Sequence, residues 1–420
     1  TVVADPIAIG SGTLTKGGNG TVTLSGTNTY TGATTISNGV LIATNANSLG
    51  TTDGATTIAD GAVLQISGGI NIGDAINLTG TGEDLAGGIR STSGNNTLSG
   101  LITLGGTSEI ASDANTLTLD VSTGAALTGT NRTIKFDGSG NITVNDPITT
   151  GSGVVNKGGS GTLTLSAANT YTGATNITMG YVAISNATGL GTTDGATTVA
   201  SGATLKISGG ITVAEAITLN GVGRSSSGAI AFTANDNTYS GAITLGSTST
   251  IVSTGGAQTI SGAVNGGYGL TITANGNLII SGAVGGSTDL SSFAVTTTGS
   301  ASQTFSANVE TTGNQTYTAA GGIVTSGART FDSSSGTVNF ASALSGDNNV
   351  TVTGNADIDG AITSIAVLSV SGTSNIGADI TTSDTQTYTG AVTLSADVTL
   401  TSSGDVITFS NTVNSADSTN

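Results

Sequence analysis

Short stretches in which apolar and polar residues alternate recur along the whole chain. Within residues 16–32, Val22 and Leu24 alternate with threonines and a serine, and glycines and asparagines lie on both sides. A period of two is typical of a half-buried strand, and the flanking residues favour turns. Further strands are expected at residues 62–66, 76–78, 142–144, 217–219, 270–272, 350–352, 392–394, 398–400 and 406–409.

The spacing of apolar residues that is typical of helices is missing. Only residues 83–86 tolerate a helical turn, and glycines bracket them. Because such short strands cannot bury their apolar face alone, we predict that they stack in successive coils of about 20–25 residues. The predicted fold is an all-β parallel β-helix (a β-solenoid), an elongated rod with essentially no helix. The alternation predicts that these side chains point inward: Val22, Leu24, Leu163, Leu165, Ile243, Leu245, Val392 and Leu394.

The first part of the chain repeats itself at an offset of 141 residues. The register holds without a gap from about residue 3 to residue 110, and residues 49–57 return unchanged as residues 190–198. The chain thus begins inside a repeat, and we expect it to be a piece of something longer. Residues 1–290 are interpreted as a solenoid with this duplication, and residues 291–420 as its continuation with a second, more acidic repeat subtype. A polar tail is expected at residues 414–418.

A five-residue motif, Asn-Thr-Tyr-Thr-Gly at residues 28–32, recurs with variations along the chain. The first residues of successive copies are separated by 68, 73, 68, 78 and 71 positions. We interpret this spacing as a super-repeat of about three coils. Five tyrosines at the third position of the motif are therefore predicted to lie along one side of the solenoid: Tyr30, Tyr171, Tyr239, Tyr317 and Tyr388.

The composition is consistent with ordered β structure that has a polar surface. Glycine accounts for 67 of 420 residues, 8% of residues are charged and 3% are aromatic. The net charge of −17 repels phosphate backbones and anionic lipids, which disfavours binding to nucleic acids and membrane surfaces. No apolar run approaches the roughly 18–20 residues that span a membrane. No signal peptide is visible, so the chain is expected to be processed or excised.

Two stretches resemble a known family. The run at residues 157–175, Lys-Gly-Gly-Ser-Gly-Thr-Leu-Thr-Leu-Ser followed by Asn-Thr-Tyr-Thr-Gly-Ala-Thr, resembles the passenger-associated strand repeat of bacterial autotransporters. Residues 16–39 resemble it equally well, and residues 386–394 are similar to repeats in secreted filamentous-haemagglutinin-like proteins. The resemblance implies a right-handed parallel β-helix exposed outside a bacterial cell. Adhesins, proteases and structural fibres share the repeat, and the family's C-terminal translocator barrel is not present here.

Residues that carry catalysis or bind metals are sparse. The absence of histidine and cysteine excludes Ser-His and Cys-His nucleophile pairs and the usual zinc sites. The glycines are read as turn residues, because a phosphate-binding loop requires a helix after it. We expect no catalytic, cofactor-binding or metal-binding residues, although aspartates on turns leave weak calcium binding open.

Pairs of carboxylates are candidate catalytic groups, because some parallel β-helices are enzymes that cleave glycans. Asp357 and Asp359 share one strand face, whereas Glu83 and Asp84 lie in a turn and become Arg-Ser at residues 224–225 in the second copy. A catalytic site has no need to appear twice at one offset, but a structural turn does. Structural or solubilising roles are therefore favoured for the charged residues present in both copies: Asp5/Asp146, Lys16/Lys157, Asp53/Asp194 and Asp74/Glu215.

These features favour an extracellular structural or adhesive segment of a bacterial cell-surface protein, acting as a stalk, fibre or surface-layer building block, and not an enzyme. Self-association into a fibre or lattice is expected, because an open solenoid end offers unpaired backbone groups. Surface glycans and a host or neighbouring cell are the other candidate partners. Two alternatives stay open: a glycan-active β-helix enzyme, which needs a cleft rich in arginine or carboxylates, and a receptor-binding adhesin.

Overall fold

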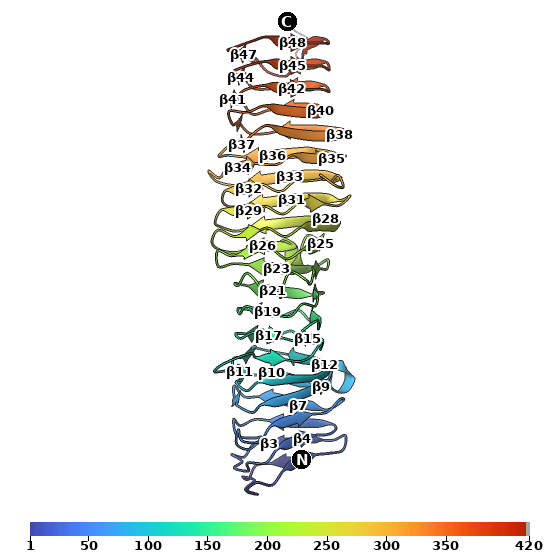
Figure 1. Cartoon of the computed structure of the whole chain (residues 1–420), viewed down its shortest axis with the longest axis vertical. Coiled ribbons are helices and arrows are strands. Elements are labelled where there is room, and N and C mark those ends of the chain that lie inside the picture. The colour runs from blue at the N-terminus through green and yellow to red at the C-terminus, as the bar shows by residue number, and fades with distance from the viewer. Residues whose placement is uncertain (417–420) are drawn as a thin grey trace. The chain divides into compact units, whose positions relative to one another are not determined.

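The computed structural model describes residues 1–416, except for the side chain of Leu85. Two compact units are present, Thr1–Lys206 and Ile207–Asn420. Within each unit the strands of successive coils lie above one another, in parallel pairings (Figure 1). The chain forms about 20 turns in all, which confirms the predicted all-β parallel β-solenoid. The predicted change of repeat subtype near residue 290 falls inside the second unit.

Unit 1 has three faces, each a column of strands that pair from coil to coil. Face 1 contains β2 (Leu14–Lys16), β4 (Thr34–Ile36), β6 (Thr56–Ile58), β9 (Ile76–Gly80), the first part of β12 (Ile102–Ser112), β14 (Leu127–Thr128) and β17 (Ile148–Thr149). Face 2 contains β1 (Val2–Val3), β3 (Thr21–Leu24), β5 (Val40–Ala43), β7 (Val63–Ser67), β10 (Ile89–Ser93), the second part of β12, β15 (Ile134–Asp137), β18 (Val155–Lys157), β20 (Thr175–Ile177) and β22 (Thr197–Val199). Face 3 contains β8 (Asn71–Ile72), β11 (Asn96–Leu98), β13 (Thr116–Leu119), β16 (Asn141–Val144), β19 (Thr162–Leu165), β21 (Gly180–Ile184) and β23 (Ala203–Ile207).

Unit 2 is built in the same way from faces 4, 5 and 6. Face 4 contains β25 (Ile217–Gly221), the first part of β28 (Ile243–Ser253), β30 (Val264–Asn265), β35 (Val309–Thr311), the first parts of β38 (Arg329–Phe340) and β40 (Val350–Ile358), β42 (Leu368–Val370), β45 (Gln386–Tyr388) and β48 (Ile407–Phe409). Face 5 contains β26 (Ile230–Phe232), the second part of β28, β31 (Gly269–Ala274), β33 (Ser292–Thr297), β36 (Gln315–Ala319), the second parts of β38 and β40, β43 (Ser374–Ile376), β46 (Val392–Leu394) and β49 (Val413–Ser415). Face 6 contains β24 (Thr212–Val213), β27 (Thr238–Tyr239), β29 (Gln258–Ile260), β32 (Leu278–Ile280), β34 (Gln303–Phe305), β37 (Ile323–Thr325), β39 (Leu344–Ser345), β41 (Ile362–Ile365), β44 (Ile380–Thr382) and β47 (Leu400–Ser402).

The alternation along the strands places the core as predicted. Leu24, Leu163, Leu165, Ile243, Leu245 and Val392 are all buried, whereas the neighbouring threonines at positions 21, 23, 162 and 164 are exposed or half-buried. Val22 and Leu394 have the expected register but are only half-buried. Because neighbouring residues on a strand point to opposite faces, this pattern confirms the predicted register.

Most predicted strands occur within two residues of their expected bounds, but β40 continues to Ile358 although a strand was expected only at residues 350–352. The stretch expected at residues 398–400 forms β47 at Leu400–Ser402. The expected polar tail begins on β49, and its residues 417 and 418 lie outside the described residues. Residues 1–416 contain two helical turns, both of the 3₁₀ type: η1 (Glu83–Leu85), at the helix-tolerant spot, and η2 (Arg224–Ser226). No helix in this part of the chain is long and apolar enough to cross a membrane.

The two copies of the duplication lie on different faces of unit 1. Strand β3 lies on face 2, but its counterpart β19 lies on face 3. Strand β4 lies on face 1, and its counterpart β20 lies on face 2. The offset of 141 residues is therefore not a whole number of coils, and the second copy is turned by one face relative to the first. The repeat encodes two adjacent faces and the corner that joins them.

The prediction that the motif tyrosines lie along one side is wrong. In unit 1, Tyr30 lies in the corner between β3 and β4, and Tyr171 lies in the corner between β19 and β20, which joins different faces. In unit 2, Tyr239 is on face 6, Tyr317 on face 5 and Tyr388 on face 4. All five side chains are buried, but a spacing of about 70 residues does not correspond to a whole number of coils.

Aromatic rings fill the core of unit 2 between β33 and β40. The Tyr317 ring stacks on Phe340 at 5.6 Å between centroids and meets Phe331 and Phe305 edge-on at 5.3 and 5.0 Å. The Tyr317 hydroxyl donates to Gln315 Oε1 at 2.7 Å, so that its polar atom is satisfied inside the core.

We expect Tyr317→Ala to lower the free energy of unfolding by about 3–5 kcal/mol, because it leaves a cavity among four phenylalanine rings. Urea denaturation followed by circular dichroism measures this change. Tyr268→Ala is the matched control, because Tyr268 is 45% exposed and its loss should change stability by less than about 0.5 kcal/mol. Equal effects of the two substitutions would contradict the assigned core.

Candidate functional site

The two lysines that occupy the same position in both copies of the duplication are buried and held by backbone carbonyls. Lys16 Nζ donates to the carbonyl oxygens of Gly17, Gly18 and Asn38 at 3.1, 2.7 and 2.8 Å. Lys157 repeats this arrangement with Gly158, Gly159 and Met179. Each ammonium therefore joins its own turn to the next coil, which supports the structural role expected from the repetition.

A buried carboxylate lies inside the corner that contains Tyr30. Asp74 is 3% exposed, and its Oδ2 accepts a hydrogen bond from Thr56 Oγ1 at 3.0 Å. Burial raises the pKa of Asp74 to about 6, and the hydrogen bond from Thr56 opposes only part of this rise. The nearby Tyr30 hydroxyl pairs with Thr34 Oγ1 at 2.7 Å. Glu215, the counterpart of Asp74 in the second copy, is also 3% exposed.

The other repeated aspartates form turns. Asp53 Oδ2 accepts from Thr51 Oγ1 at 3.0 Å, and Asp194 Oδ2 accepts from Thr192 Oγ1 at 3.4 Å. Asp146 Oδ2 accepts from the backbone N–H of Val121 on the preceding coil at 2.7 Å. These contacts match the structural interpretation of the repeated acids, and Asp5 is exposed.

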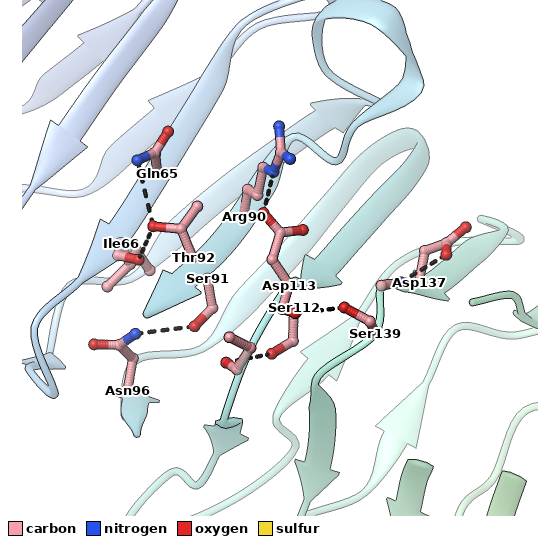
Figure 2. A network of polar contacts seen from close by, with 12 residues as sticks. Gln65, Ile66, Arg90, Ser91, Thr92, Asn96, Ser112, Asp113, Asp137 and Ser139 are labelled. Carbon is pink, nitrogen blue, oxygen red and sulfur yellow. Dashed lines mark hydrogen bonds and ion pairs between the residues drawn. The ribbon is translucent and has the colours of Figure 1, made fainter. Parts of the chain in front are cut away.

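Acidic and basic side chains form ion pairs on the outer side of face 2, across β10, β12 and β15. Figure 2 shows the Arg90 side chain directed at Asp113, and Arg90 Nε lies 2.8 Å from Asp113 Oδ2. One strand further on, Lys135 Nζ lies 3.3 Å from Glu109 Oε2 and 2.5 Å from Asp137 Oδ2.

Burial and neighbouring charges act in opposite directions on the pKa values of this cluster. Burial raises the pKa of Glu109, and the charge of Lys135 offsets part of that rise. Burial alone would lower the pKa of Lys135, but its hydrogen bond to Asp137 and the charge of Glu109 raise it overall. Burial alone would raise the pKa of Asp137, yet hydrogen bonds from Lys135 and the Gly138 N–H lower it. The three groups are thus held as a charged, mutually paired set.

Glu109 is buried although its strand position points outward. The excursion at residues 81–88 follows β9 and leads into β10, and the Gly88 N–H at its end donates to the Glu109 carbonyl at 2.9 Å. The excursion at residues 222–229 keeps this geometry in the second copy, with the Ala229 N–H donating to Thr250 at 2.8 Å. The sequence reasoning missed this cluster. The sequence feature that could have indicated it is the spacing of Glu109 and Lys135, which is about one coil and places them side by side on neighbouring strands.

The candidate carboxylate pair of unit 2 is engaged by amides. Asp357 Oδ2 accepts from Asn339 Nδ2 at 2.6 Å, and its Oδ1 accepts from Asn375 Nδ2 at 2.8 Å. Asp359 Oδ2 also accepts from Asn339 Nδ2, at 3.1 Å, so the two carboxylates do lie on the same side. Both oxygens of Asp357 have neutral amide partners from neighbouring coils, which is an arrangement typical of a structural ladder. No group of three or more potential metal ligands occurs in the described residues, and weak calcium binding stays a prediction.

Two segments of unit 1 match a protein-family model. Residues 14–43 and 155–184 match the passenger-associated-transport-repeat family. Each segment is a passenger-associated-transport repeat. The segments comprise β2–β5 and β18–β21, and they contain Lys16, Lys157 and both corner tyrosines of unit 1. No curated protein and no solved structure matches the chain at a significant level.

These repeats and the parallel β-solenoid together support an autotransporter passenger domain. A passenger-associated-transport repeat implies a secreted or cell-surface protein. The matched residues are those that hold the corner together, so the repeat explains the architecture and leaves the specific role to be proposed.

We expect Asp74→Asn to reduce the pH dependence of stability. The folded-state pKa of about 6 lies above the ordinary value of 3.8, so this group contributes its full stability below about pH 4 and loses it as the pH rises through 6. Because of this higher pKa, the free energy of unfolding of the wild-type chain should fall by at most about 3 kcal/mol over this pH range. Urea denaturation at pH 4.5 and pH 7.5 should therefore show the variant to be more stable than the wild type at the higher pH.

Asp53→Asn is the control for this measurement, because Asp53 also recurs in both copies but is exposed in a turn. It should leave the pH dependence of the wild type unchanged. Identical pH profiles for the wild type and Asp74→Asn would show that the buried carboxylate is not destabilising when charged.

Proposed function

We propose that this chain is a non-catalytic structural segment of a bacterial surface protein, exposed outside the cell as a stalk. The observation that carries the proposal is the parallel coil-on-coil pairing of strands that continues from one end of each unit to the other. Repeated coils add length without adding a new core, because each coil contacts mainly its neighbours. The charged groups that recur in the duplication hold turns and corners, which suits a spacer.

A stalk should tolerate the loss of a whole coil but not of part of one. Phe340 pairs with Ile358, and Leu344 pairs with Ile362, so deletion of residues 341–358 removes one coil and leaves the next in register. Deletion of residues 341–349 instead joins face 5 directly to face 4 and leaves out face 6.

The test displays both deletion variants on a bacterial surface with an epitope tag on the end remote from the anchor. We expect the whole-coil variant to be exported and folded, with a reach shorter by about 4.8 Å, and the part-coil variant to be degraded. Protease resistance and antibody access to the tag measure the two outcomes. Cleavage of polysaccharides by the purified wild-type chain would favour the enzyme alternative and contradict the stalk.

We also propose that copies of the chain associate side by side through face 3. One outward residue per coil forms an uncharged ladder there, in register from Asn71 through threonines 97, 118, 143 and 164 to Ala183. Flat ladders of this kind can pair with a second copy, and charged residues on such a surface oppose pairing.

Sedimentation at increasing protein concentration tests this association. The wild-type chain should form oligomers that Thr118→Lys combined with Thr143→Lys abolishes. The matched control is Thr35→Lys combined with Thr57→Lys, which changes the equivalent ladder of face 1 and should leave association intact. A monomer at all concentrations, or equal loss in both double variants, would contradict a role for face 3.

A further inference from the structure

A shallow groove crosses three coils of unit 1 where face 1 turns toward face 2. Its lining includes Thr103, Thr128 and Thr149, which are register partners on β12, β14 and β17. Shortly after each threonine in the chain is a glycine, at positions 105, 129 and 151, and these glycines also line the groove. A Cβ atom on Gly129 would lie 3.1 Å from Leu104 Cβ and 3.2 Å from Arg132 Cγ. The groove is therefore open because glycine has no side chain, and Leu104 provides an apolar part of its lining.

Arg132 lies on the wall of this groove and differs from the other bases of unit 1. It is exposed, and it forms no ion pair with any residue in the described part of the chain. The other bases have structural partners: Lys16 and Lys157 are held by carbonyls, Arg90 and Lys135 form ion pairs, and Lys206 lies 3.8 Å above the Tyr181 ring. Arg132 is thus the base whose position is not explained by packing.

The neighbouring residue is oriented to serve as a second donor. Asn131 has a φ of 55°, and its Oδ1 accepts a hydrogen bond from the Ser152 N–H at 3.0 Å. This contact fixes the side-chain amide and leaves its Nδ2 group available for a ligand. The groove therefore combines a guanidinium, an amide, a row of three hydroxyls and an apolar patch.

Both residues lie in the part of unit 1 that the duplication does not cover. The copies extend from about residue 3 to residue 110 and from the corresponding positions of the second copy onward, so residues 111–143 occur once. The repeated charged residues hold corners and turns, whereas Asn131 and Arg132 occur in a single copy. A position used for recognition has no structural need to recur.

We propose that this groove binds an acidic saccharide, with the carboxylate of a uronic or sialic acid on Arg132 and ring hydroxyls on Asn131 and the threonine row. A planar guanidinium matches a carboxylate, and a sugar ring offers both hydroxyls and an apolar face. A polyanion is disfavoured, because unit 1 carries twelve acids against six bases. A single carboxylate on an otherwise neutral ring suits one unpaired arginine. The inference rests on the proposed exposure of the chain outside the cell, but binding by the purified chain tests the groove separately.

Isothermal titration of the purified chain tests the proposal with four probes: an oligosaccharide with a single sialic acid, an otherwise neutral oligosaccharide with a single uronic acid, and the carboxyl-reduced form of each. We expect binding of at least one acidic probe and at least tenfold weaker binding of its reduced form, because a charge-assisted hydrogen bond is lost. Arg132→Ala should weaken binding about tenfold or more, and Arg132→Lys by less. Arg90→Ala is the matched control, because Arg90 is paired with Asp113, and it should leave binding unchanged.

The pattern of the probes identifies the source of the carboxylate, since binding of either acidic probe alone supports the groove and names its ligand. Three results would overturn the proposal: no binding of either acidic probe, equal binding of acidic and reduced forms, or unchanged binding by Arg132→Ala. Circular dichroism of the variants excludes unfolding as the cause of a loss. A chain that is displayed and folded as a stalk but binds neither probe would refute the groove and leave the stalk intact.

Discussion

The whole structure depends on the parallel pairing of each short strand with the coil before it and the coil after it. A strand of three or four residues is not stable by itself, and here the backbone groups of each strand are satisfied by its neighbours along the column. The closeness of this packing is clearest at the corners, where a Cβ atom on Gly32 would collide with the Gly12 carbonyl and one on Gly54 with the Gly32 carbonyl. Two successive coils therefore require glycine at the same place, and Gly173 and Gly195 repeat the arrangement.

Buried polar side chains extend the same coil-to-coil pairing into the corners. Asn28 Oδ1 accepts from the Ile7 N–H at 2.8 Å and its Nδ2 donates to the Ser48 carbonyl at 2.6 Å, so that one amide joins three coils. Asn169 makes the equivalent pair of contacts with Ile148 and Gly189. The buried lysines act in a similar way through their ammonium groups. A buried polar group is stabilising only when it is satisfied, and the repeat supplies the partners along with the group.

The residues shared by the two passenger-associated-transport repeats maintain corners, and their repetition follows from the need to hold each coil on the next. Residues that occur once do not have to hold one coil on the next. The Glu109–Lys135–Asp137 cluster and Arg132 both involve the stretch that is not duplicated, but the charges of the cluster pair with one another, whereas Arg132 forms no ion pair in the described residues.

The sequence by itself determined the local structure, because the period of two decides which side of a strand is apolar. It was sufficient for the parallel β-solenoid, for the inward positions such as Leu163 and Leu165, and for the structural role of Lys16 and Lys157. Only the tertiary structure decided which face each strand occupies. Coil length varies, since Ile358 pairs with Ile376 but Ile66 pairs with Ser91, and these differences accumulate along the column. The motif tyrosines therefore lie on different faces despite their even spacing, and the burial of Glu109 and the groove at Arg132 arise from contacts between coils that no local pattern records.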